Sequence, residues 1–155
     1  METTLVLVKP DGVQRRLVGR ILARFEEKGF QIVGLRFARL ERALLERHYG
    51  AHRGKPFYEG LVSYMASSPV VVLALRGKNA VAVVRKMMGA TFGSKAEPGT
   101  IRGDFAISDG FNLVHGSDSA EAAAKEMEIF FGGAGVVEWE PGDGEWVYDA
   151  SDGAR

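Results

Sequence analysis

Apolar residues follow two spacings along the chain, and the switches between them indicate where strands and helices lie. Continuous apolar or β-branched runs predict strands at residues 3–8, 30–40, 70–75 and 112–115. Apolar positions that recur every three to four residues predict helices at residues 18–28, 41–49, 57–66, 80–88 and 120–131. This alternation of short strands with helices predicts one small α+β sandwich.

The ends of these elements carry local signals. Pro10-Asp11-Gly12 predicts a turn after the first strand, and Gly89 is placed to end a helix. Asn79 is expected to cap that helix, and residues 118–121 resemble a capping box. Residues 91–104 contain three glycines and a proline, which predicts a long irregular loop.

The totals exclude several classes of protein. The 155 residues suffice for a single domain over residues 1–155, which would bury about two thirds of its unfolded surface. Lys plus Arg and Asp plus Glu both number 20, so no basic excess favours nucleic acid or an anionic membrane. The absence of cysteine excludes disulfides and thiolate chemistry. Since no apolar run reaches membrane-spanning length and no signal-peptide pattern occurs, we expect a cytoplasmic protein.

Common phosphate and metal motifs are absent or weak. Neither G-x-G-x-x-G nor G-x-x-x-x-G-K-[ST] occurs, so any phosphate must be held by side chains. His48 and His52 are four residues apart, which would place both on one helix face as metal ligands. Gly50 between them weakens a helix and no third ligand is evident, so a solvated helix end is the alternative.

A third histidine stands out by its surroundings. Residues 111–119 read FNLVHGSDS and place His115 at the end of an apolar run. Gly116 would let a ligand approach closely, and a helix starting at Ser117 and Asp118 would favour an anion near its N-terminus. Imidazole in such a place can act as a nucleophile or general base near neutral pH. A purely structural histidine is the alternative.

Other candidate side chains are scattered along the sequence. Lys9 directly follows the first strand, and Arg85 and Arg102 offer guanidinium groups that suit phosphate oxygens. For all three, a solvated surface position is the alternative. Phe57 is either a core residue or a ring that stacks on a flat ligand. Glu126 lies one position off the apolar stripe of the last helix, where it either orients the histidine or is solvated.

Four stretches together resemble the nucleoside diphosphate kinase family. They read VKPDGVQR, HYGAHRGKPFYEGLV, PGTIRGDF and NLVHGSDS, and the resemblance extends over residues 3–148. It implies a ferredoxin-like sandwich, in which helices cover a four-stranded antiparallel sheet. It also implies a reversible ping-pong reaction that moves the γ-phosphate of a nucleoside triphosphate, typically ATP, to a nucleoside diphosphate through phosphohistidine at His115.

The resemblance implies a role for each matching residue around the nucleotide. Lys9 would contact the ribose hydroxyls and the transferring phosphate, and Asn112 would bind the sugar 3′-hydroxyl. Tyr49 would lie near the transferring phosphate. Phe57 would stack on the base, which any base permits because each has a π-face. Arg102 would contact the phosphate chain.

The remaining implied roles concern the β-phosphate, the histidine and the metal. Arg85 and Thr91 would hold the β-phosphate, while Ser117 and Glu126 would support the histidine. Mg²⁺ is expected mainly on the nucleotide phosphates, with Asp118 a candidate for a contact through water.

A few positions depart from the family pattern. Phe92-Gly93 follows Thr91, where the family often has Asn-Pro or a similar turn. Asp109 and Phe111 replace residues that are frequently apolar and basic respectively. These positions lie near the expected nucleotide entrance, so they concern affinity and loop rigidity rather than the reaction.

The family assembles as hexamers, or as tetramers in many bacterial members with shorter tails. The longer tail here, residues 139–155, favours a homohexamer in which the tail packs on a neighbouring subunit. A non-enzymatic nucleotide-binding regulatory module on the same fold is the main alternative. Loss of His115, Lys9 or Arg102 would favour it, and all three are present. A nucleic-acid-binding role is a second alternative, against which the neutral net charge argues.

Overall fold

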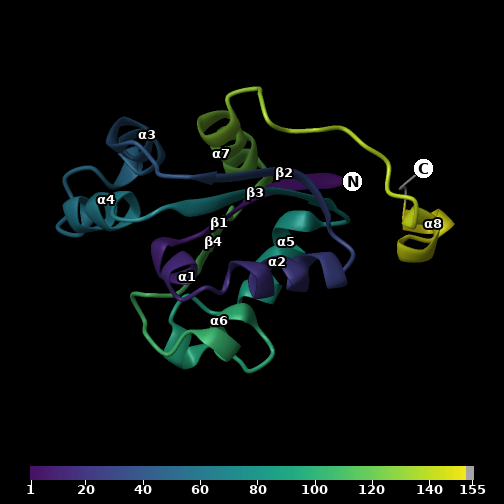
Figure 1. Cartoon of the computed structure of the whole chain (residues 1–155), viewed down its shortest axis with the longest axis horizontal. Helices are drawn as coiled ribbons and strands as arrows, with labels where there is room; N and C mark the ends of the chain where they lie inside the picture. Colours follow the sequence, from purple (N-terminus) through teal and green to yellow (C-terminus); the bar gives the residue numbers. More distant parts are fainter. Residues whose placement is uncertain (153–155) are drawn as a thin grey trace.

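The computed structural model describes residues 1–152, whose strands form a four-stranded sheet (Figure 1). The sheet has the order β2-β3-β1-β4, and every neighbouring pair is antiparallel. This confirms the expected four-stranded antiparallel sheet. The strands are β1 (Glu2–Val8), β2 (Gln31–Ala38), β3 (Val70–Gly77) and β4 (Val114–Gly116).

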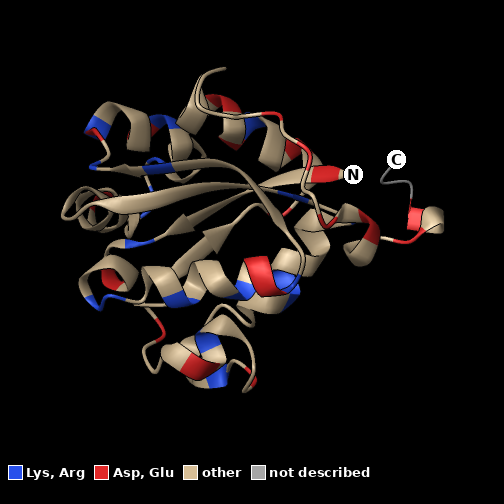
Figure 2. Ribbon diagram, turned by 45° about the vertical axis from the view of Figure 1, so that its right-hand side comes forward, with Lys and Arg blue, Asp and Glu red and all other residues tan. Residues whose placement is uncertain are grey.

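Helices cover both faces of the sheet, which explains why the central strands are unbroken apolar runs. In β1, Val6 and Val8 enter one core while Leu5 and Leu7 enter the other. Figures 1 and 2 show the two helical layers on opposite sides of the sheet. The first core is covered by α2 (Val18–Glu27), α5 (Ala80–Met88) and α6 (Ile101–Phe105), and the second by α3 (Arg42–His48), α4 (Tyr58–Ala66) and α7 (Ala120–Phe131).

Several element ends differ from the sequence prediction. The expected turn at residues 10–12 is the start of a short helix, α1 (Pro10–Gln14), because proline suits the first helical position. The prediction that Asn79 caps α5 was wrong, since its side chain makes no capping bond and its backbone is left-handed with φ of 50°. Helix α7 (Ala120–Phe131) has the bounds that the apolar spacing predicted, but it does not start at Ser117 and Asp118, because Ser119 caps it by accepting from the Ala122 N–H at 3.0 Å.

The expected irregular loop at residues 91–104 is partly helical. It contains the 3-10 turn η2 (Gly93–Lys95) and the beginning of α6. The Thr100 hydroxyl caps α6 by accepting from the Gly103 N–H at 2.9 Å. A Cβ at Gly103 would lie 1.9 Å from the Glu97 carbonyl oxygen, so a side chain cannot fit there. The loop is therefore built by local polar contacts that the apolar pattern does not reveal.

After α7 the chain runs back along β2. The Val137 N–H donates to the Val33 carbonyl at 2.7 Å, and the Trp139 indole donates to the Ile32 carbonyl at 3.0 Å. Two short helices follow, α8 (Gly144–Val147) and η3 (Ala150–Asp152). Packing of residues 139–155 on a neighbouring subunit stays a prediction, and residues 153–155 lie outside the described part. Within residues 1–152, no helix is both long and apolar enough to cross a bilayer.

Candidate active site

Strand β4 carries His115 to the side of the sheet covered by α3 and α7. His115 is the middle residue of β4 and stands opposite Leu7 of β1. Because side chains alternate along a strand, Val114 enters the first core while the His115 ring faces the other layer, with 29% of its side chain exposed. Ligand approach at Gly116 stays a prediction, but packing gives this glycine a second reason. A Cβ there would lie 2.6 Å from Met88 Sδ, so packing on α5 is what requires the glycine.

Glu126 of α7 orients the His115 ring. Its Oε1 lies 3.1 Å from His115 Nε2, and its Oε2 accepts a 2.6 Å hydrogen bond from the Ser117 hydroxyl. Burial opposes ionisation of Glu126, but the hydrogen bonds from His115 and Ser117 outweigh it and lower the pKa. The carboxylate is therefore ionised near neutral pH and can only accept. His115 Nε2 consequently carries the proton, and Nδ1 keeps a free lone pair.

His48 meets a different partner from the one that the sequence suggested. Its ring lies nearly perpendicular to that of His115, with the ring centroids 5.2 Å apart. Burial and then repulsion from His115 lower the pKa of His48 to about 4, so its ring is neutral near pH 7. His52 belongs to the 3-10 turn η1 (Gly50–His52), and its Nδ1 lies 3.2 Å from Lys55 Nζ. Among residues 1–152, His48 shares a possible metal-ligand group with His115 and Glu126. His48 ends α3 while His52 lies in η1, so the expectation that the two share one helix face was wrong.

Lys9 and Asn112 lie next to each other at the ends of β1 and β4. The Lys9 ammonium donates to Asn112 Oδ1 at 2.6 Å, and Asn112 Nδ2 donates to the Thr91 carbonyl at 2.8 Å. Burial lowers the pKa of Lys9; nearby Asp11 opposes this and Arg102 adds to it. Three segments that are distant in the sequence therefore meet at the half-buried Lys9 ammonium. Lys9 is not a solvated surface residue, which was one of the two alternatives considered from the sequence.

Arg102 is buried, contrary to the surface alternative considered from the sequence. Its guanidinium donates to the carbonyls of Asn112 at 3.2 Å, Gly89 at 3.0 Å and Val114 at 2.8 Å. Burial and the nearby charge of Arg85 lower its pKa to about 10, so it remains charged at neutral pH. Two of its five N–H groups stay available after these bonds. Arg85 itself is exposed, as is Thr91.

The two aromatic candidates each pack against another histidine. Tyr49 packs against His48 with ring centroids 4.4 Å apart, and burial raises the pKa of its hydroxyl. Phe57, at the start of α4, is 51% exposed and packs only edge-on against His52 among the aromatic rings. A half-exposed ring at a helix start can stack on a flat ligand, so the core alternative for Phe57 was wrong.

Sequence reasoning missed the residues that hold the entrance to β4. One Asp11 carboxylate oxygen accepts the Leu113 N–H at 3.0 Å, and the other accepts the Tyr64 hydroxyl at 2.6 Å. Leu113 is fully buried and has a left-handed backbone with φ of 70°, a strained conformation for a non-glycine residue. The carboxylate of the KPDG stretch was the available signal. The Asp11 carboxylate fixes the backbone of Leu113, which follows Asn112 and lies two residues before His115.

The positions that depart from the family pattern have local partners. Phe111 lies tilted against Tyr64 with ring centroids 5.4 Å apart. Asp109 accepts a hydrogen bond from the Ser94 hydroxyl, and Lys95 lies over the Phe92 ring at 5.3 Å. Of these contacts, the Ser94–Asp109 bond joins the loop after α5 to the segment before β4.

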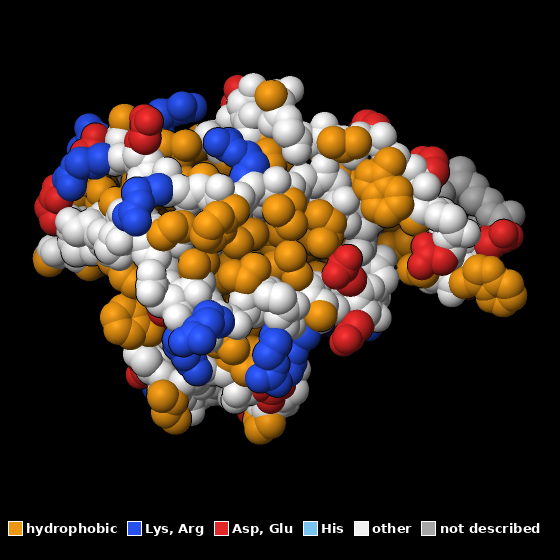
Figure 3. Space-filling model, viewed as in Figure 1, with side chains coloured by type: hydrophobic (Ala, Val, Ile, Leu, Met, Phe, Trp, Pro, Cys, Tyr) orange, Lys and Arg blue, Asp and Glu red, His pale blue; other side chains and the backbone are white. Residues whose placement is uncertain are grey.

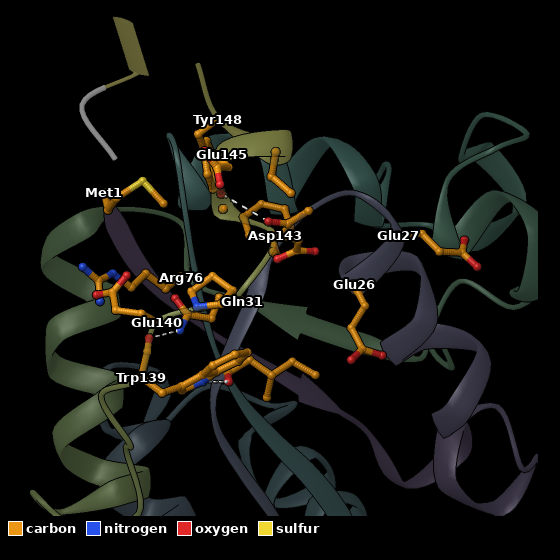
Figure 4. A pocket seen from close by; sticks show the side chains of 16 residues that line it. Met1, Glu26, Glu27, Gln31, Arg76, Trp139, Glu140, Asp143, Glu145 and Tyr148 are labelled. Atoms are coloured by element: carbon orange, nitrogen blue, oxygen red, sulfur yellow. Dashed lines mark hydrogen bonds between the residues drawn. The ribbon is translucent and has the colours of Figure 1, made fainter. Parts of the chain in front are cut away.

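One cavity of the structure has no predicted site residue in its lining. It measures about 610 Å³ and lies under the C-terminal segment, where Trp139, Tyr148 and Phe30 line it together with Arg76 and several carboxylates (Figure 4). The candidate site is therefore a surface region around β4, rather than this cavity.

Fold and site together define the class of the protein. The charge of Arg102 helps to lower the pKa of Lys9, and the charge of Arg85 helps to lower the pKa of Arg102, so these cations lie near one another and favour a phosphate ligand. Beside them is a partly exposed imidazole with one free nitrogen. An α+β sandwich that carries this combination has the groups that transfer of a phosphoryl group requires.

The comparisons name the family. The family model for nucleoside diphosphate kinase matches residues 2–136, and the chain belongs to that family. It is 54% identical over 149 residues to a nucleoside diphosphate kinase of Pelotomaculum thermopropionicum, covering 96% of this chain and 100% of that protein. These findings confirm the family and the kind of enzyme expected from the sequence.

Solved structures give the same result for the fold. A nucleoside diphosphate kinase from Halobacterium salinarum in complex with CDP superposes with a TM-score of 0.92 at 45% identity, covering 96% of this chain and 99% of that chain. A nucleoside diphosphate kinase family protein from Babesia bovis gives a TM-score of 0.93 at 40% identity, covering 96% and 100% respectively.

Proposed function

We propose that the chain transfers the γ-phosphate of a nucleoside triphosphate, typically ATP, to a nucleoside diphosphate by a reversible ping-pong reaction through phosphohistidine at His115. The observation that carries this proposal is the hydrogen bond between His115 Nε2 and Glu126. It commits Nε2 to the proton and leaves Nδ1 as the nucleophile.

In the first half-reaction, the Nδ1 lone pair of His115 forms a bond to the γ-phosphorus as the bond to the β,γ-bridging oxygen breaks. The nucleoside diphosphate leaves with both electrons of that bond. In the second half-reaction, a terminal β-phosphate oxygen of another nucleoside diphosphate attacks the phosphorus, and the P–N bond breaks. Glu126 stabilises the positive charge that His115 gains on phosphorylation, because its carboxylate faces Nε2.

Cations near His115 supply the electrostatic part of catalysis. A phosphoryl transition state spreads negative charge over several oxygens, so fixed positive groups and positioning provide most of the acceleration. Lys9 would contact the transferring phosphate and the ribose, Arg102 the phosphate chain, and Arg85 with Thr91 the β-phosphate. Arg102 suits this role because three backbone carbonyls hold its guanidinium in place.

The remaining residues would hold the nucleoside. Asn112 would bind the sugar 3′-hydroxyl, Phe57 would stack on the base, and Tyr49 would lie near the transferring phosphate. The half-exposed ring of Phe57 supports stacking without base selectivity. The CDP bound to the Halobacterium salinarum relative is a ligand of this class.

Mg²⁺ would enter the site on the nucleotide phosphates. Mg²⁺ prefers oxygen ligands, keeps several waters and commonly binds through one carboxylate plus substrate phosphates. The donors here fit that mode, because Glu126 is engaged by His115 and Ser117 while Asp118 is exposed and can reach a hydrated ion. When bound, the ion neutralises charge on the phosphate oxygens.

We also propose a homo-oligomer, a hexamer, in the cytoplasm. Strand β2 lies at an edge of the sheet and exposes Leu35 and Phe37 by 51% and 64%. Figure 3 shows apolar side chains gathered over the middle of the face where β2 runs. Apolar edge strands are normally covered, and a second copy would do so. Mass determination in solution tests this, with six chains of 16.8 kDa expected.

Intact mass spectrometry after brief incubation with ATP and Mg²⁺ tests the reaction. Wild type should gain one phosphoryl group that is acid-labile and is discharged by added GDP, and His115→Ala should gain none. If folded wild type binds nucleotide but gains no phosphoryl group, the chain is a non-enzymatic nucleotide-binding regulatory module. If His115→Ala is still phosphorylated, the nucleophile has been assigned to the wrong residue.

A further inference from the structure

We propose that His48, His115 and Glu126 form a binding site for a transition-metal ion such as Zn²⁺ in the nucleotide-free protein. The three residues come from the end of α3, the middle of β4 and the second half of α7. One potential ligand atom from each lies within 4.8 Å of the other two. This site is separate in chemistry from the Mg²⁺ expected on nucleotide phosphates.

The distances fit a metal after small movements. His115 Nε2 and Glu126 Oε1 are 3.1 Å apart, and the rings of His48 and His115 are nearly perpendicular with centroids 5.2 Å apart. Ligand atoms around a tetrahedral zinc lie roughly 3.3 Å from one another. The widest separation in the group therefore has to close by at most about 1.5 Å, which side-chain rotation can supply.

The ligand types favour zinc over magnesium. Two imidazoles and one carboxylate are a common zinc set, in which water completes the coordination. Mg²⁺ prefers oxygen ligands in a near-ideal octahedron, which two imidazoles do not provide. The three side chains should therefore bind a transition metal in preference to the Mg²⁺ that accompanies the nucleotide.

The His48 ring supplies an independent observation. Its Nε2 is buried and has no hydrogen-bond partner among residues 1–152. A buried polar atom without a partner is unfavourable, and most such atoms in folded proteins are paired. A metal bound between His48 and His115 would give this ring a partner, and the partly exposed side chain of His115 leaves a route from solvent.

A metal in this position would occupy His115 or draw away the Glu126 carboxylate that orients it. Zn²⁺ would therefore inhibit phosphoryl transfer, and this consequence rests on the proposed function. The binding site itself does not rest on it, because the three side chains are present without nucleotide.

The histidine NMR spectrum of the wild-type protein tests the site directly. The chain has three histidines, so the ring signals are few, and His52→Gln assigns one of them. One equivalent of Zn²⁺ added to metal-free and nucleotide-free protein should shift the ring nitrogens of His48 and His115 and leave His52 unchanged. No shift, or a shift centred on His52, overturns the proposal.

Affinity measurements with variants provide the second test. His48→Gln and Glu126→Gln should each weaken Zn²⁺ binding at least tenfold, whereas His52→Gln and Glu128→Gln should match wild type. Glu128 is an exposed carboxylate on the same helix, so it controls for charge alone. Circular dichroism verifies that each variant is folded. If His48→Gln does not fold, the Zn²⁺ affinity of Glu126→Gln still tests the site. Unchanged affinity in a folded variant of either residue overturns the site.

The two proposals fail separately. Kinase activity is measured first with Mg²⁺ and a trace of chelator that removes zinc. Zinc binding without kinase activity would contradict only the proposed function. Kinase activity in a protein that does not bind zinc would contradict only the metal site.

Discussion

The Lys9 ammonium donates a 2.6 Å hydrogen bond to Asn112 Oδ1, although 103 positions separate the two residues in the chain. The bond joins the end of β1 to the residue that precedes Leu113 and β4. The bond holds the Lys9 ammonium at the entrance to the His115 region. Burial lowers the pKa of this ammonium. If both residues contact the same nucleotide, their contributions to its binding are coupled.

A double-mutant cycle measures that coupling. We expect Lys9→Ala and Asn112→Ala each to weaken nucleoside diphosphate binding by about tenfold or more. The double variant should lose less than the sum, with a coupling of roughly 0.5–3 kcal/mol, because either change alone already breaks the shared contact. Isothermal titration of the four proteins gives the coupling, and additive losses would show that the two side chains act independently.

Glu126→Gln should slow phosphorylation of His115 by about 10- to 100-fold while the fold persists. The amide can donate as well as accept, so it no longer commits the proton to Nε2 of His115. Ser117→Ala should be milder, because it removes one hydrogen bond to Glu126 and leaves its charge. Rapid-quench measurement of phosphohistidine formation compares them, with Glu128→Gln as the control. A wild-type rate in Glu126→Gln would remove this residue from the mechanism.

His48 should make the folded protein less stable as the solution is acidified. Its folded-state pKa of about 4 lies below the ordinary value of 6.5, so below pH 6.5 the unfolded chain takes up a proton that the folded chain does not. The free energy of unfolding should therefore fall by on the order of 2 kcal/mol from pH 7 to pH 5 because of this group alone. His48→Gln should remove that slope, and His52→Gln should not. Urea unfolding across this pH range distinguishes them; parallel slopes in all three proteins would contradict the assignment.

Gly116→Ala should lower the free energy of unfolding by about 1–3 kcal/mol, because the new methyl group collides with the buried Met88 side chain. Met88→Ala should relieve the collision, so the double variant should be more stable than the sum of the two single changes predicts. Gly110→Ala is the matched control, since nothing lies within 4 Å of a Cβ there. If Gly116→Ala is as stable as Gly110→Ala, packing on α5 is not what requires this glycine.

The spacing of apolar residues predicted those strands and helices whose own sequence contains a clear apolar run or an apolar face. β1 and β3 are apolar on both faces, and the apolar positions of α2 share one face, so these elements could be recognised without knowing their neighbours. The element ends at Asn79 and Ser119 were less predictable, because a cap depends on local backbone geometry that several residue types permit.

By itself, then, the sequence determined the sandwich, the family and the identity of His115 as the residue to examine, because hydrophobic period and short motifs are local properties of the chain. Tertiary structure alone decided that Arg102 is buried, that His48 faces His115 rather than His52, and that Gly116 serves packing. Each of these facts depends on which side chains meet across the sheet, and residues far apart in sequence meet only when both cores have formed.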